Sequence, residues 1–162
     1  MVLGATGSIL TIIVAFVSVL QLANAVNTPI LSANSLFQRC CEARTTIKPG
    51  CTKYCTYEPD GFGRTSLRRM FFHLDHECPF TSLAGYLLCA SVNHDHTPEC
   101  KARGVERTIA GDRCLDLCNL TAGRTIKLTP AHWPCVTTLD KVRDVMREYA
   151  DKILVQNKHT DA

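Results

Sequence analysis

Ten cysteines constrain this chain more than any other feature of its sequence. They are Cys40, Cys41, Cys51, Cys55, Cys78, Cys89, Cys100, Cys114, Cys118 and Cys135. They follow an uncharged segment, residues 1–25, whose apolar run ILTIIVAFVSVLQL ends in Ala23-Asn24-Ala25. A small-x-small end after such a run is typical of a secretory signal peptide. An even number of cysteines behind a signal peptide predicts disulfides, here five, formed in an oxidising compartment.

The N-terminal segment has a second interpretation, because its start, MVLGATGS, carries no lysine or arginine. The alternative is an uncleaved membrane anchor. A spanning helix needs roughly 20 apolar residues, and the run here covers only Ile9 to Leu22. We therefore expect cleavage before Val26. The mature chain then has 137 residues (162 − 25), keeps every cysteine and has no stable association with a membrane.

Apolar periodicity predicts a small all-α domain of five or six short helices, held together by about five disulfides. NSLFQRCCEAR favours a first helix, capped by Asn34 or Ser35. A second helix is expected from Thr65 or Ser66. Its apolar stripe comprises Leu67, Met70, Phe71 and Leu74. PFTSLAGYLLCAS is apolar nearly all round, which predicts the central core helix.

The C-terminal region has the clearest helical pattern. Thr137-x-x-Asp140 resembles a capping box. The apolar face that follows comprises Leu139, Val142, Val145, Met146, Tyr149 and Ile153. Asp144–Arg147 and Glu148–Lys152 are the expected ion pairs on its other side, each worth only tenths of a kcal/mol. The organisation predicted is a signal peptide at 1–25, a leader at 26–35, a cysteine-rich domain at 36–154 and a tail at 155–162.

The order and spacing of the cysteines resemble those of a known family. The pieces are FQRCC, CTKYC, Cys78 before Pro79, CASVNHDHTPEC, KARGV, AGDRCLDLC and WPC. Together they resemble the DB module, a cysteine-rich extracellular domain known chiefly from nematode proteins and distantly related to the insulin growth factor-like family. The resemblance covers about residues 36–150. It implies an extracellular domain and supplies no molecular activity.

The chain departs from this family in its number of cysteines, which is usually twelve. Glu99 stands before Cys100 where the family has an adjacent cysteine pair, and no cysteine follows Cys135. We expect the two missing cysteines to be partners, so that one whole disulfide is absent and no thiol is left over. The C-terminal helix is then held by its apolar face alone. Adjacent Cys40 and Cys41 are expected to bond to two different segments, since a bond between neighbours is strained.

The stretch CASVNHDHTPEC raises the question of a metal site, because His94, Asp95 and His96 are possible ligands and His73 and His76 could add to them. Zinc sites in such chains recruit thiolates, which an oxidising compartment removes. Asp95 or Thr97 can instead cap a helix that Pro98 opens. We expect a stapled loop with a helix cap and no bound metal or other cofactor.

No catalytic motif is present: the chain has no G-x-S-x-G, no H-E-x-x-H and no glycine-rich phosphate loop. The formal net charge of +3 gives no reason to expect nucleic-acid binding. Arg64, Arg68 and Arg69 fit a solvated helix face, with a basic binding patch as the alternative. Trp133 is either packed on a disulfide or exposed as an interface anchor.

These observations predict a secreted glycoprotein that is not an enzyme and that binds an extracellular protein or receptor, as a ligand or in adhesion. Asn119-Leu120-Thr121 is the sequon expected to carry the glycan. Two other functions stay open. A protease inhibitor or toxin-like effector requires a protruding loop, for which residues 58–64 are the candidate. A lipid-binding helical protein requires a contiguous apolar cavity.

Overall fold

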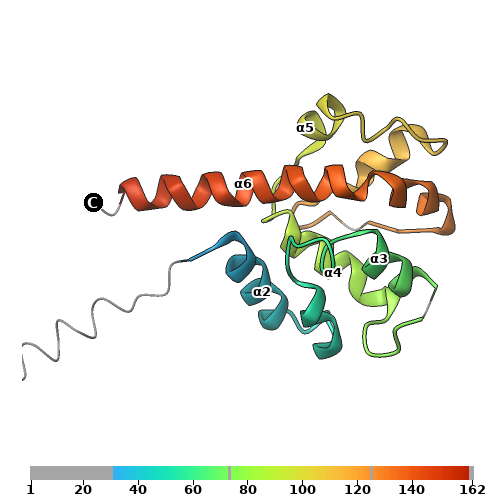
Figure 1. Ribbon diagram of the computed structural model, residues 1–162, viewed down its shortest axis with the longest axis horizontal. Coiled ribbons are helices and arrows are strands. Elements are labelled where there is room, and N and C mark those ends of the chain that lie inside the picture. The colour runs from blue at the N-terminus through green and yellow to red at the C-terminus, as the bar shows by residue number, and fades with distance from the viewer. Residues whose placement is uncertain (1–30, 73, 125, 161–162) are drawn as a thin grey trace, which may run out of the picture. The chain divides into compact units, whose positions relative to one another are not determined.

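The computed structural model describes residues 31–72, 74–124 and 126–160, and the predicted signal peptide lies outside these residues. The elements are α2 (Ala33–Ala43), η1 (Pro49–Tyr54), α3 (Arg64–Phe71), η2 (Phe80–Ser82), α4 (Leu83–Ala90), α5 (Thr97–Ala102), η3 (Gly111–Leu117), η4 (Pro130–Thr138) and α6 (Leu139–Thr160), where η marks a 3-10 helix. Within the described ranges the only β-pairing is one isolated bridge, between Asp95 and Asn119. The predicted all-α class is confirmed (Figure 1).

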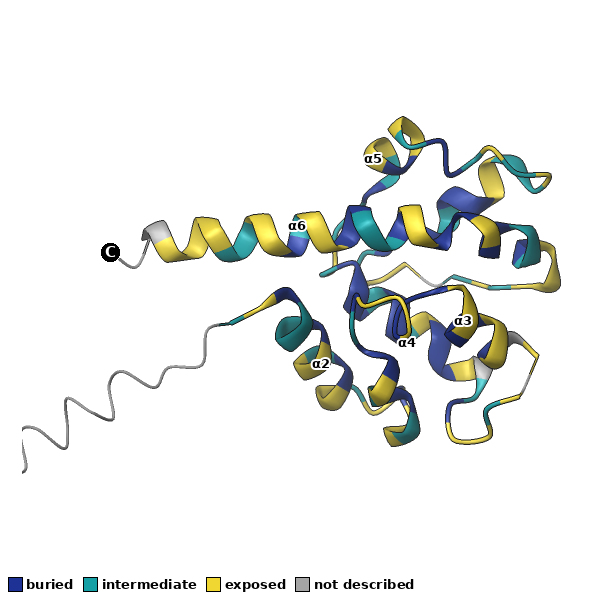
Figure 2. Cartoon of the chain, in the orientation of Figure 1, coloured by how far each residue is buried: buried dark blue, intermediate teal, exposed yellow. Residues whose placement is uncertain are grey.

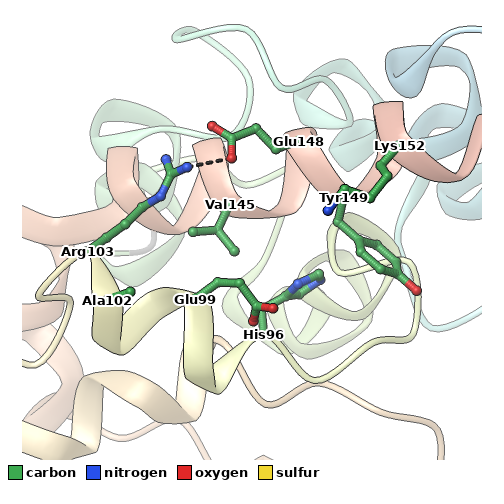
Figure 3. A pocket seen from close by; sticks show the side chains of 8 residues that line it. All are labelled: His96, Glu99, Ala102, Arg103, Val145, Glu148, Tyr149 and Lys152. Carbon is green, nitrogen blue, oxygen red and sulfur yellow. Dashed lines mark hydrogen bonds and ion pairs between the residues drawn. The ribbon is translucent and has the colours of Figure 1, made fainter. Parts of the chain in front are cut away.

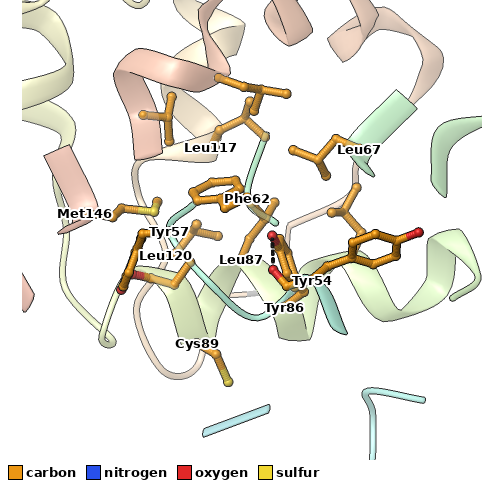
Figure 4. Close-up of a cluster of buried hydrophobic side chains, with 14 of the residues drawn as sticks. Tyr54, Tyr57, Phe62, Leu67, Tyr86, Leu87, Cys89, Leu117, Leu120 and Met146 are labelled. Carbon is orange, nitrogen blue, oxygen red and sulfur yellow. Dashed lines mark hydrogen bonds between the residues drawn. The ribbon is translucent and has the colours of Figure 1, made fainter. Parts of the chain in front are cut away.

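The core forms around α4, as its apolar sequence predicts. Leu83, Tyr86 and Leu87 of this helix are fully buried, and α4 packs against both α2 and α6. Phe37 of α2 contacts the ring of Tyr86 at 5.2 Å and the ring of Tyr57 at 5.0 Å. Figure 4 shows part of this cluster, in which the two tyrosine rings lie among aliphatic side chains.

The buried tyrosines satisfy their hydroxyl groups on backbone carbonyls. Tyr57 Oη donates to Ala90 O at 2.6 Å, and Tyr86 Oη donates to Tyr54 O at 2.9 Å. A buried hydroxyl without a partner costs free energy, so these bonds allow both rings to stay inside. Burial also raises the pKa of Tyr57 and that of Tyr86 above the ordinary tyrosine value.

All ten cysteines are paired in five disulfides. The pairs are Cys40–Cys89, Cys41–Cys55, Cys51–Cys78, Cys100–Cys118 and Cys114–Cys135. Adjacent Cys40 and Cys41 bond to different segments, as expected. Three disulfides lie within residues 40–89 and two within residues 100–135, so no covalent bond joins the two sets except the chain itself.

Helix α6 packs against both disulfide-bonded regions. It contacts α2 and α4 of the first and α5 and η4 of the second. Val142, Val145 and Met146 of α6 are fully buried, and the helix carries no cysteine. Figure 2 shows this buried side giving way to exposed residues over the last turns. Non-covalent packing of α6, together with that of α3 on η4, therefore joins the two regions.

The N-caps predicted for the first and the last helix are wrong. Helix α2 begins at Ala33, because Ser32 Oγ accepts the Ser35 N–H at 3.1 Å and Ser35 Oγ accepts the Ser32 N–H at 2.8 Å. Helix α6 continues directly from η4, so its first turn needs no capping box. Thr137 Oγ1 instead donates to Pro134 O at 2.8 Å.

The predicted ion pairs of the last helix are replaced by others. Asp144 pairs with Arg143 at 3.0 Å, and Glu148 pairs with Arg103 of the loop after α5. The apolar stripe of α3 is also shorter than expected. The helix ends at Phe71 and the Leu74 N–H bonds to Arg69 O, which turns the chain and leaves Leu74 65% exposed.

Candidate functional site

The stretch 89–100 is a stapled loop, but its two cysteines bond to distant partners and not to each other. Its backbone is held by a hydrogen bond from His96 N to Cys118 O at 2.9 Å. Asp95 Oδ1 accepts the Thr97 N–H at 2.9 Å and the Thr97 hydroxyl at 2.6 Å. The N-cap residue of α5 is His96, which makes no side-chain cap bond, so the cap predicted for Asp95 or Thr97 is replaced by this turn just before the helix. These two bonds also lower the pKa of Asp95.

The two histidines of this loop pack on α6. The His94 ring stacks on Tyr149 with centroids 4.2 Å apart, and the His96 ring meets Tyr149 at 5.0 Å and a steep angle. His96 is buried, and its Nε2 lies 2.9 Å from Ser91 O. Because a carbonyl only accepts, Nε2 carries the proton. Across the described ranges, no three histidine, cysteine, aspartate or glutamate side chains are grouped to hold a metal ion.

A groove of about 320 Å³ lies beside these rings, between α5 and α6. Figure 3 shows Glu99 and Arg103 on one wall and Glu148, Tyr149 and Lys152 on the other, with the Arg103–Glu148 ion pair across it. Its lining includes no serine, threonine or cysteine nucleophile. Arg103 and Glu148 pair across it, and α5 packs on α6 at this place, so we assign this groove to the packing of the two helices.

A second polar cluster joins η1 to the segment before Cys78. Asp75 accepts a short hydrogen bond from Tyr54 Oη. The Lys53 ammonium forms ion pairs with Asp75 at 3.1 Å and with Glu77 at 2.9 Å. The Tyr54 hydroxyl and then the Lys53 ammonium lower the pKa of Asp75 to about 2. The cluster lies next to the Cys51–Cys78 disulfide, and Asp75 Oδ1 accepts the Cys78 N–H at 3.2 Å.

The buried His96 makes stability depend on pH. Burial lowers the pKa of His96 below its ordinary value of 6.5, so the unfolded chain binds a proton more readily than the folded one. We expect the free energy of unfolding to be unaffected by His96 above pH 6.5. It should decrease as the pH falls from there through the pKa that His96 has in the folded state. The slope should approach at most about 1.4 kcal/mol per pH unit.

Chemical denaturation between pH 4.5 and 8 measures this dependence, and His96→Gln should flatten it. Asp75 and Asp95, whose pKa values are lowered, lose their contributions below this window. His76→Gln, at an exposed histidine, is the matched control and should keep the slope. An unchanged slope in His96→Gln would assign the dependence to another group.

The described residues expose one aromatic pair, between α3 and η4. Phe72, the residue after α3, is 51% exposed and contacts the half-buried Trp133 ring at 4.5 Å, edge to face. Arg64, Arg68, Trp133 and Pro134 line a groove of about 180 Å³ at the same place. We call these residues with Phe72 the α3–η4 groove. Neither alternative predicted for Trp133, packing on a disulfide or exposure as an anchor, included this contact with Phe72.

The loop expected for a protease inhibitor is built into the core. Phe62 is fully buried and meets Tyr86 edge to face at 5.6 Å. Gly63 lies so close to Pro59 O that a Cβ atom has no room there. Residues 61–63 of the segment are buried and only residues 58–60 and 64 are exposed, so its centre is part of the core and not the tip of a protruding loop.

An apolar space in the interior is too small for a lipid. It is lined by leucines, Val136 and His132 and measures about 10 Å³, roughly the space of one water molecule. The described residues contain no helix that is both long and apolar enough to span a bilayer. This space cannot hold an acyl chain.

The glycosylation site predicted at Asn119 lies at the surface beside the histidine loop. Asn119 is half-buried, and its backbone pairs with Asp95 in the isolated bridge. Its modification stays a prediction.

A helical domain of this size with five disulfides and a surface aromatic groove belongs to the class of small disulfide-rich domains. The family model of the DB module matches residues 39–146. The chain therefore belongs to the DB module family, a family of cysteine-rich domains that is not a known enzyme family. Comparison with curated proteins and with solved structures gave no match.

Proposed function

We propose that the chain is a secreted, non-enzymatic module that binds an extracellular protein through the α3–η4 groove. The observation that carries the proposal is the contact of the exposed Phe72 ring with Trp133. Aromatic side chains and arginine dominate the binding energy of protein interfaces, and large exposed apolar groups mark such sites.

The groove is held rigidly from both sides, which supports the same function. Leu67 and Met70 anchor α3 in the core, and the Cys114–Cys135 disulfide anchors η4 two residues after Trp133. A surface that is already ordered loses little conformational entropy on binding. The disulfides and the predicted signal peptide fit an extracellular setting.

The proposal predicts that Phe72→Ser weakens binding at least tenfold. The test uses full-length protein secreted from eukaryotic cells, screened against an array of purified ectodomains, with affinities measured for each hit. Because Phe72 is half-exposed, its loss should change the free energy of unfolding by about 0.5 kcal/mol or less.

Val155→Ser is the matched control, since Val155 is 56% exposed on α6, away from the groove. It should leave every affinity unchanged. If both variants bind as the wild type does, the α3–η4 groove is not the binding surface.

A further inference from the structure

Three side chains of the α3–η4 groove form a row along α3. Arg64, Arg68 and Phe72 are four residues apart, so they lie on one side of the helix. Four residues of a helix advance about 6 Å. Alternate residues of an extended chain point to the same side and lie about 6.6 Å apart. The row therefore matches the side-chain repeat of an extended peptide over about 12 Å.

The two arginines of the row have no internal counter-charge in the part of the chain that the structure describes. Arg103, Arg124, Arg143 and Arg147 pair with carboxylates, whereas Arg64 and Arg68 have none within 4 Å. Other arginines without an ion pair exist, but only Arg64 and Arg68 line a groove beside an exposed aromatic pair. Helix α3 contains no acidic residue. Two exposed guanidinium groups beside each other repel, so this arrangement does not serve the stability of the helix.

The arginine at the first position of α3 is also unfavourable for the helix itself. Arg64 stands at the positive end of the helix dipole, where an anion is stabilising and a cation is not. An incoming carboxylate would relieve both this interaction and the repulsion from Arg68.

The opposite wall of the groove carries no charge. It is formed by Trp133, Pro134, Val136 and Thr137 of η4. The aromatic contact of Phe72 with Trp133 lies at one end of the row and the arginines at the other. A ligand that fits must therefore combine negative charge at one end with an apolar side chain at the other.

We infer that the α3–η4 groove binds an extended segment of a partner protein with two carboxylates and an apolar side chain at alternate positions. This rests on the proposed function and deepens it by defining the chemistry of the partner. Each carboxylate pairs with one arginine, and the apolar side chain packs on Phe72 and Trp133.

The test uses two synthetic peptides of the same composition and the full-length secreted protein. Acetyl-Gly-Asp-Ser-Asp-Ser-Leu-Gly-amide has the alternation, and acetyl-Gly-Ser-Asp-Asp-Leu-Ser-Gly-amide lacks it. NMR titration should show the first binding at least fivefold more tightly than the second. The double variant Arg64→Glu/Arg68→Glu should weaken binding at least tenfold and leave the melting temperature unchanged or higher. The same variant should gain binding to acetyl-Gly-Lys-Ser-Lys-Ser-Leu-Gly-amide.

Arg39→Glu/Lys48→Glu is the matched control, because it makes the same change in net charge at two exposed residues away from the groove. It should bind the first peptide as the wild type does. Equal loss in both double variants would reduce the effect to net charge and overturn the inference. Equal affinity for the two acidic peptides, no binding of either, or binding of a heparin oligosaccharide in their place would also overturn it.

The two proposals fail separately. If Phe72→Ser loses an ectodomain while no acidic peptide binds, the groove is still the interface and only the chemistry assigned to its partner is wrong. If Phe72→Ser changes nothing in either assay, the proposed function itself is wrong.

Discussion

Removing the Cys40–Cys89 disulfide by replacing both residues with alanine is expected to lower the free energy of unfolding by about 4 kcal/mol. This disulfide closes the longest loop of the five, with a sequence separation of 49 between its cysteines. A longer loop restricts the unfolded chain more, so its loss restores more conformational entropy to that state. Small domains have about 5–15 kcal/mol of net stability, so the loss is a large part of the total.

Removal of the Cys41–Cys55 disulfide is the matched comparison, because it starts from the adjacent residue of α2 and closes a loop of 14 residues. Its loss should cost about 3 kcal/mol. Guanidinium denaturation of both double-alanine variants measures the difference. A larger loss for the shorter loop would mean that packing around the cysteines, and not chain entropy, sets their contribution.

The second large effect is expected from Met146→Asp, which should lower the free energy of unfolding by about 4 kcal/mol or more. Met146 is fully buried in the core cluster of Figure 4, so the substitution removes its packing and places a carboxylate among apolar side chains. Because α6 carries no disulfide, we expect it to detach while the five disulfides keep each region compact.

Hydrogen exchange distinguishes detachment of α6 from global unfolding. In Met146→Asp, amides of α6 should lose protection more than amides of α4, which lies inside the first disulfide-bonded region. Val155→Asp places the same charge at an exposed position of the same helix and should change stability by about 0.5 kcal/mol or less. Equal loss of protection in α4 and α6 would contradict a separate role for α6.

Local patterns account for the parts of the fold that were predicted correctly. The all-round apolar sequence of α4 requires burial on several sides, and Asp95 and Thr97 bond to each other in the turn just before α5. The N-terminus of α2 was placed too late, because Ser32 and Ser35 cap each other before the apolar pattern begins. The prediction that Leu74 continues the apolar face of α3 is wrong, because the chain turns away from the helix axis after Phe72.

The candidate site was only partly predictable. Arg64 and Arg68 were recognised as a possible basic patch, and Trp133 as a possible interface anchor. Nothing in the order of residues indicates that η4 brings Trp133 against Phe72, because 60 positions separate them in sequence. An apolar residue at a helix end is equally compatible with burial, so the exposure of Phe72 follows only from where its neighbours pack.

The sequence by itself determined the helical class, the number of disulfides, the membership of the DB module family and the expected compartment. These depend on the count and order of residues and on periodicities shorter than one helix. The tertiary structure decided which cysteines pair, how α6 packs on two separately bonded regions, and which aromatic side chains meet beside Arg64 and Arg68. Those features depend on distances between segments far apart in the chain, which are set only once the helices have packed against one another.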